Sequence, residues 1–179
     1  MLNQDVEKIL ISQEEISERC KQLGESISKD YEGKVPVVIG LLKGSVPFMA
    51  ELIKYISIDC ELEFMAVSSY SGTESMGDVR ILKDLDRSIK GCDVLIVEDI
   101  VDTGKTLQKV KELLYSKGAN SVKVVSLLDK PSRRIVDITA EYIGFEIPNE
   151  FVIGFGLDFN QKYRNLPYVG VLKEELYKE

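Results

Sequence analysis

The spacing of apolar residues near the N-terminus predicts a helix followed by a buried strand. Four apolar residues recur at steps of four, three and four, so they share one helix face: Ile16, Cys20, Leu23 and Ile27. Ser12 and Glu15 match a capping box at the start of this helix. The segment 32–34 breaks the helix, and the largely apolar run 35–42 predicts a buried strand.

The next segments follow helix, strand and loop patterns in turn. Ser45 is placed to cap a second helix that runs to about Tyr55. Apolar and acidic residues alternate over 58–66, which is typical of a strand with one polar face. Residues 68–78 (SSYSGTESMGD) are mostly small and polar, so we expect a long loop there.

The rest of the chain alternates between strand and helix patterns. A helix is expected from about Thr106 to Gly118. The further strands are expected at 79–83, 94–97, 122–128, near 142–143 and at 151–157. Such an alternation predicts an α/β fold, with a mostly parallel sheet covered by helices. Ligands of these sheets bind beyond the carboxyl ends of the strands.

Length and composition are those of one globular domain. The 179 residues are 44% hydrophobic and 30% charged, and no Pro/Gly/Ser-rich linker divides them, so we expect a single domain over 1–179. No apolar run approaches the roughly 20 residues that span a bilayer. The first residues lack the basic and apolar regions of a signal peptide. We therefore expect a cytoplasmic protein with no membrane partner.

Charge and residue counts exclude several kinds of chemistry. A net charge of −7 disfavours nucleic-acid binding, which needs a basic face. The absence of histidine removes Ser-His-Asp catalysis and histidine-ligated metal sites, so acid–base work falls to other side chains. The three cysteines form no C-x-x-C pair and are expected in the core: Cys20, Cys60 and Cys92.

The strongest chemical signal is the string EDIVDTGKT at 98–106, directly after the apolar strand 94–97. Its amides, its threonine hydroxyls and the helix start form a candidate phosphate cradle. Its three carboxylates would repel phosphate unless a divalent cation binds or the carboxylates contact hydroxyls, and a sugar phosphate suits both options. A P-loop needs a glycine where this chain has Asp99, so that motif is excluded.

The segment LIVEDIVDTGKT resembles the phosphoribosyl diphosphate motif of the type I phosphoribosyltransferases. Four further blocks are similar to hypoxanthine-guanine phosphoribosyltransferases of bacterial type: LLKGS at 41–45, SSYSGTESMGD at 68–78, LLDKPSRR at 127–134 and EFVIGFGLDFNQKYRNLPYVG at 150–170. The resemblance covers nearly the whole chain. It implies a mostly parallel, twisted sheet flanked by helices, with a small hood subdomain built from the N- and C-terminal segments.

This resemblance implies transfer of a 5-phosphoribosyl group from phosphoribosyl diphosphate to hypoxanthine or guanine. The products would be IMP or GMP and pyrophosphate, and the cofactor would be Mg²⁺. Asp102 would be the general base that takes the proton from purine N7. The residues implied to bind the ribose and 5-phosphate are Glu98, Asp99, Asp102, Thr103, Gly104, Lys105 and Thr106.

Residues of the other blocks would bind the remaining parts of the substrates. Those implied for pyrophosphate are Lys43, Gly44 and Arg164, and the family often holds the peptide bond before this lysine in the cis form. Those implied for the purine are Lys130, Phe151, Val152 and Asp158. The magnesium ligands would be Glu98, Asp99 and Asp158. A loop containing Ser69 and Tyr70 would close over the site. The neighbouring Arg133 and Arg134 are expected to be solvated and without a role.

Two alternatives remain open. A regulator on the same fold could sense phosphoribosyl diphosphate or a nucleotide and bind RNA, although the net charge of −7 disfavours the basic surface that RNA needs. A related transferase could use another base. Lys130 disfavours adenine, whereas xanthine stays possible because backbone groups contact the purine 2-position. The family usually forms dimers or tetramers, so we expect a homodimer or homotetramer.

Overall fold

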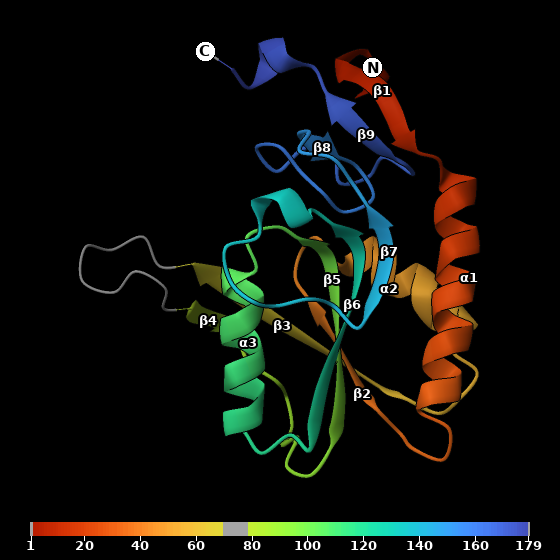
Figure 1. The fold of residues 1–179 in the computed structure, drawn as a ribbon, viewed down its shortest axis with the longest axis vertical. Helices are drawn as coiled ribbons and strands as arrows, with labels where there is room; N and C mark the ends of the chain where they lie inside the picture. The colour runs from red at the N-terminus through yellow and green to blue at the C-terminus, as the bar shows by residue number, and fades with distance from the viewer. Residues whose placement is uncertain (1, 70–78, 179) are drawn as a thin grey trace.

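A computed structural model describes residues 2–69 and 79–178 (Figure 1). Its main body is a six-stranded sheet in the order β4-β3-β2-β5-β6-β7. The strands are β2 (Val37–Leu41), β3 (Glu61–Ser69), β4 (Val79–Lys83), β5 (Asp93–Val101), β6 (Ser121–Asp129) and β7 (Tyr142–Glu146). Neighbouring strands pair in parallel, except that β4 is antiparallel to β3. The expected mostly parallel sheet is confirmed.

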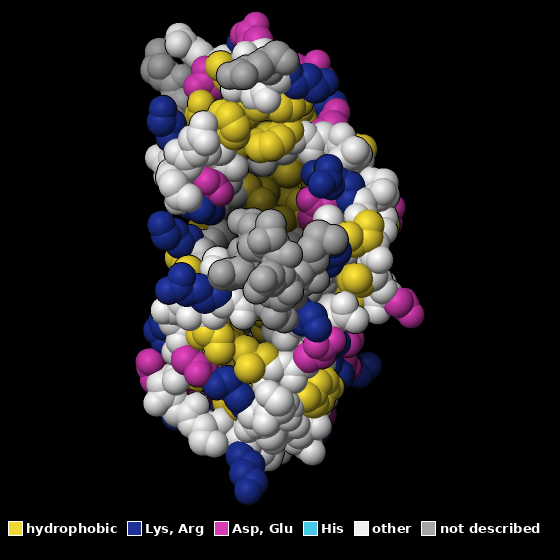
Figure 2. Space-filling model, turned by 90° about the vertical axis from the view of Figure 1, so that its left-hand side faces the viewer, with side chains coloured by type: hydrophobic (Ala, Val, Ile, Leu, Met, Phe, Trp, Pro, Cys, Tyr) yellow, Lys and Arg dark blue, Asp and Glu magenta, His cyan; other side chains and the backbone are white. Residues whose placement is uncertain are grey.

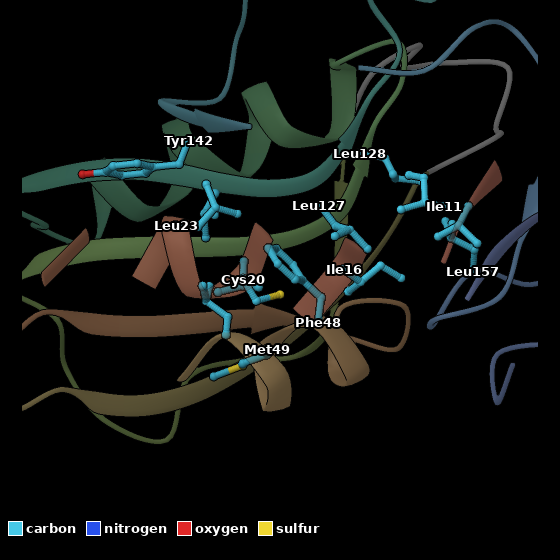
Figure 3. Close-up of a cluster of buried hydrophobic side chains, with 14 of the residues drawn as sticks. Ile11, Ile16, Cys20, Leu23, Phe48, Met49, Leu127, Leu128, Tyr142 and Leu157 are labelled. Carbon is cyan, nitrogen blue, oxygen red and sulfur yellow. The ribbon is translucent and has the colours of Figure 1, made fainter. Parts of the chain in front are cut away.

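Helices cover both faces of this sheet (Figure 1). One face carries α1 (Gln13–Asp30) and α2 (Val46–Leu52), which continues as the 3-10 turn η2 (Ile53–Tyr55), and the other carries α3 (Lys105–Ser116). Successive strand residues face opposite sides. Leu95 and Val97 therefore pack in a cluster with α1 and α2, part of which Figure 3 shows. Val94 and Ile96 pack in a second cluster with α3.

A small antiparallel sheet forms the expected hood from the two ends of the chain. Its order is β1-β9-β8, with β1 (Val6–Ile11), β8 (Val152–Ile153) and β9 (Val169–Leu172). The hood lies above the carboxyl ends of the parallel strands (Figure 1). Ile11 and Leu157 bring its apolar side into the cluster of α1 and α2 (Figure 3). Besides η2, the other 3-10 turns are η1 (Leu2–Asp5), η3 (Pro131–Arg133) and η4 (Glu174–Leu176).

The start of α1 agrees with the sequence prediction, whereas the end of β5 does not. The Glu15 amide donates to Ser12 Oγ at 3.2 Å, and the Ser12 amide donates to Glu15 Oε2 at 2.7 Å, so the capping box is present. The strand predicted at 94–97 continues to Val101 because its polar end still pairs with β6. Glu98 and Asp99 therefore lie in a strand, not in a loop.

Other predicted elements have different positions in the structure. The strand expected at 58–66 is β3, shifted to Glu61–Ser69, and residues 70–78 of the expected loop lie outside the described residues. Of the strand expected at 151–157, only β8 forms, and it belongs to the hood. The chain turns directly after it, at Gly154 and Gly156, which have φ of 94° and 101°. The strands β1 and β9 were not predicted.

Three further expectations can be compared with the structure. Ser45 precedes α2, but its side chain makes no capping hydrogen bond. Cys20 is buried in the core, and Cys60 and Cys92 are partly buried and pack against the core clusters. None of the described helices is long and apolar enough to cross a membrane.

Gly24 allows α1 to approach η2 closely. A Cβ at this position would lie 2.6 Å from Tyr55 Cβ and 2.7 Å from the Tyr55 carbonyl oxygen. Alanine normally stabilises a helix interior by about 1 kcal/mol relative to glycine, but here it would force two packed elements apart. We expect Gly24→Ala to lower the free energy of unfolding by about 1–3 kcal/mol, measured by urea denaturation followed by circular dichroism.

The matched control is Glu25→Ala, an exposed position on the same helix, which should change the free energy of unfolding by less than about 0.5 kcal/mol. An unchanged or higher stability of Gly24→Ala would contradict the close approach.

Candidate active site

The molecule is hollowed where the hood meets the carboxyl ends of the strands. Figure 2 shows this hollow with hydrophobic side chains at its bottom and charged side chains on both sides. A cavity of about 590 Å³ lies here, and the lining residues that concern the site are Ile100, Asp102, Lys130, Phe151, Val152 and Asp158. A second cavity, of about 110 Å³, also contacts Ile100 and Asp102. Asp102 therefore faces a larger and a smaller compartment.

The smaller compartment is lined by residues that the sequence predicts for the phosphate cradle. It is lined by Glu98, Thr103, Gly104 and Thr106 in addition to the two shared residues. Gly104 has a φ of 85° and precedes α3 without a side-chain cap, so the first amides of the helix remain available to an anion. A Cβ on Gly104 would overlap the side chains of Val136 and Ile138. Lys105 is exposed and does not line the cradle.

Glu98 and Asp99 are consecutive residues of β5, so their side chains leave opposite faces of the sheet. Burial raises the pKa of Glu98 well above its usual value, and the nearby Asp99 raises it further. Burial also raises the pKa of Asp99, although the Ile100 amide donates to its Oδ1 at 2.8 Å and opposes the shift. Both carboxylates keep some exposed surface, yet both are poorly solvated. A bound cation would stabilise their charged forms.

The predicted magnesium ligands do not form one cluster. Among residues 2–69 and 79–178, no three carboxylate or thiol side chains are grouped closely enough to hold a metal ion. Asp158 instead pairs with Arg164 Nη2 at 2.9 Å and accepts from the Gln161 amide at 2.8 Å. One or two carboxylates still fit Mg²⁺, which commonly keeps several waters and takes further oxygens from its substrate.

The residues predicted for pyrophosphate meet at a turn of the hood. The Leu42–Lys43 peptide bond is cis, as the family resemblance implies. Gln161 Oε1 accepts from Lys43 Nζ at 3.4 Å and from Arg164 Nη2 at 3.3 Å, so it links the two cations. Arg164 Nη1 also donates to the Gly156 carbonyl oxygen at 2.7 Å. Sequence reasoning missed Gln161, since its role depends on contacts between distant segments.

Lys130 and Phe151 lie in the larger compartment. The Lys130 side chain is largely buried, and its Nζ donates to the Glu150 carbonyl oxygen at 2.9 Å. Burial lowers the pKa of Lys130, while the charge of Asp102 acts in the opposite direction. The neighbouring Val152 is buried, and 36% of Phe151 is exposed. A flat ligand could therefore contact an apolar ring and a buried ammonium group together.

Arg133 is exposed, as predicted, whereas the Arg134 side chain is largely buried, and both form hydrogen bonds to Asp102. Arg133 Nε donates to Asp102 Oδ1 at 2.7 Å. The guanidinium of Arg134 pairs with Asp129 and donates to the Ile138 carbonyl oxygen, and its Nε donates to the Asp102 carbonyl oxygen at 3.1 Å. Both side chains thus fix the loop that carries Asp102.

The predicted closing loop is only partly described. Ser69 is the last residue of β3, and Tyr70 lies outside the described residues.

Known proteins resemble this chain over its whole length. A family model described as a phosphoribosyl transferase domain matches residues 8–160. The hypoxanthine-guanine phosphoribosyltransferase of Lactococcus lactis subsp. lactis is 60% identical over 99% of this chain and 97% of its own length. The enzyme of that name from Streptococcus thermophilus is 55% identical over the full length of both chains.

A solved structure gives the same result for the fold. The crystal structure of a hypoxanthine phosphoribosyltransferase from Staphylococcus aureus matches with a TM-score of 0.96 and 52% identity, covering 99% of this chain and 97% of that chain. The family model, the sequence relatives and the solved structure agree on the family and the fold. The chain therefore belongs to the phosphoribosyltransferase family.

Proposed function

We propose that this protein transfers the 5-phosphoribosyl group of phosphoribosyl diphosphate to hypoxanthine or guanine, giving IMP or GMP and pyrophosphate. The observation that carries the proposal is the position of Asp102 between two compartments. The smaller compartment suits a 5-phosphate, and the larger one suits a 6-oxopurine. The names of the close relatives support the same reaction.

In this mechanism Asp102 accepts the proton from purine N7 while N9 forms the bond to the sugar. The bond between the anomeric carbon of the sugar and the pyrophosphate oxygen breaks through a cationic, oxocarbenium-like state, which nearby carboxylates stabilise. The purine displaces Arg133 from Asp102 Oδ1 as it takes up this contact. Lys43 and Arg164, with the Gly44 backbone, bind the departing pyrophosphate.

The base would be selected in the larger compartment. Lys130 donates to purine O6, and adenine, which presents a donor at that position, would leave both groups poorly paired. Phe151 stacks on the ring, Val152 contacts its edge through the backbone, and Asp158 lies beside it. Ser69 and Tyr70 belong to the segment that would close over the substrates.

Magnesium would be held by Glu98 or Asp99 together with water and substrate oxygens. When bound, it neutralises charge on the pyrophosphate leaving group. The poor solvation of both carboxylates supports this assignment, because a cation offsets the cost of burying their charges.

We also propose that residues 1–179 act as one domain. Ile11 at the end of β1 and Leu157 after β8 support this, because both belong to the core cluster of the main body. A homodimer or homotetramer and a cytoplasmic location stay predictions from the family resemblance.

The first test is ultraviolet absorbance on mixing the protein with phosphoribosyl diphosphate, Mg²⁺ and one purine. We expect turnover with hypoxanthine and guanine, none with adenine, and loss of all turnover when EDTA removes Mg²⁺. Turnover with xanthine would widen the substrate range. No absorbance change with any purine, despite tight binding of phosphoribosyl diphosphate, would contradict the transferase activity and favour a regulator on the same fold.

Asp102→Asn tests the general base. The amide keeps the size of the side chain but cannot accept the N7 proton, so kcat should fall by about 10²–10⁴-fold. Binding of phosphoribosyl diphosphate, measured by calorimetry, should change little. Asp137→Asn, an exposed position on the loop after η3, is the matched control and should leave kcat unchanged. A wild-type kcat in Asp102→Asn would remove Asp102 from this role.

A further inference from the structure

Two hood side chains flank the ring of Phe151. The ring of Tyr177 is stacked on it, with centroids 4.7 Å apart and 24° between the planes. Phe159 meets it edge-on, with centroids 5.6 Å apart and 90° between the planes. Both arrangements are favourable for aromatic pairs. Together they restrict the ring of Phe151 from two directions, although the ring remains 36% exposed.

Tyr177 reaches this position because the last segment of the chain is folded back and fixed. The Lys173 amide donates to the Asp5 carbonyl oxygen at 3.1 Å, which ties the start of the segment to η1. The turn η4 follows, closed by the Tyr177 amide donating to the Glu174 carbonyl oxygen at 3.2 Å. Tyr177 then packs against the apolar cluster of the hood.

The stacked pair also lines two neighbouring cavities. Phe151 and Tyr177 both line the compartment that contains Asp102 and Lys130. Both also line a neighbouring cavity of about 590 Å³, bounded by Glu7, Val171 and Lys173. Removal of the Tyr177 ring would leave one face of Phe151 without its partner.

We propose that Tyr177 is a positioning residue for the purine, acting through Phe151. This inference rests on the proposed function, in which Phe151 stacks on the base. A ring held in place before binding loses less rotational freedom when the base arrives, so the base binds more tightly. The stack does not touch the cradle or the residues assigned to pyrophosphate. Its effect should therefore appear in purine binding and be absent from phosphoribosyl diphosphate binding.

The test compares Tyr177→Ala with two matched variants. Tyr177→Phe keeps the ring and removes the hydroxyl, and Leu176→Ala changes the adjacent tail residue, which lines neither cavity. We expect Tyr177→Ala to raise the KM for hypoxanthine and guanine by about 3- to 10-fold, the size of one aromatic pair. Its kcat and its KM for phosphoribosyl diphosphate should stay within about 2-fold of the wild type. Tyr177→Phe and Leu176→Ala should behave as the wild type.

Three kinetic outcomes would overturn the proposal. A wild-type purine KM in Tyr177→Ala would show that Phe151 needs no support. Equal increases in KM for both substrates, or a loss in Leu176→Ala of the same size, would indicate a general effect on the hood. A lower purine KM would show that Tyr177 competes with the base.

Calorimetry with GMP separates this proposal from the proposed function. If the wild type binds GMP without turnover, and Tyr177→Ala weakens that binding 3- to 10-fold while Tyr177→Phe does not, the positioning role holds and the transferase fails. If the wild type neither turns over nor binds GMP, both are overturned.

Discussion

The site depends on the close approach of three chain segments at Gly44 and Gly156. A Cβ on Gly44 would overlap the carboxylate of Asp99 at the end of β5. A Cβ on Gly156 would overlap the carbonyl oxygen of Gly44, and its φ of 101° also favours glycine. The turn after β2 therefore lies against the carboxylate of Asp99 on one side and against the backbone of the first hood turn on the other. This contact brings Arg164, which donates to the Gly156 carbonyl oxygen, close to Asp99.

The acidic residues at this place would repel the anionic substrate that we propose. The chain has a net charge of −7, yet its proposed substrate is strongly anionic. Arg133 and Arg164 are paired with Asp102 and Asp158, so neither cation presents its full charge to a ligand. Glu98 and Asp99 have no comparable arginine or lysine bonded to them among the described contacts, and burial raises the pKa of both. An anion can approach these acids only with a cation or with hydroxyl groups between them, and a sugar diphosphate with magnesium provides both.

Sequence reasoning predicted the main body better than the hood, for a physical reason. Strands β2 and β6 are specified by nearly continuous apolar runs, because both faces of these strands are buried, and helix α1 by an apolar stripe on its one buried face. The strand β1 has only one buried residue, Ile11, and β8 is only two residues long, so neither carries a clear pattern. The pattern does not predict that β5 continues beyond Val97, because Glu98 and Asp99 interrupt its apolar run, whereas pairing with β6 keeps the strand extended to Val101. Contacts such as that of Lys43 with Gln161, 118 residues apart, exist only after folding.

In the proposed site, the main body and the hood have different roles. The segments that directly follow the buried strands β5 and β6 supply Asp102, Lys130 and most of the proposed cradle. The hood supplies Phe151, Val152 and the tail that stacks on Phe151. Ile11 and Leu157 connect the two parts through one core, so packing sets the distance between the proposed base site and the proposed sugar site. Substitutions in the hood can therefore alter which base fits while the cradle and the general base stay in place.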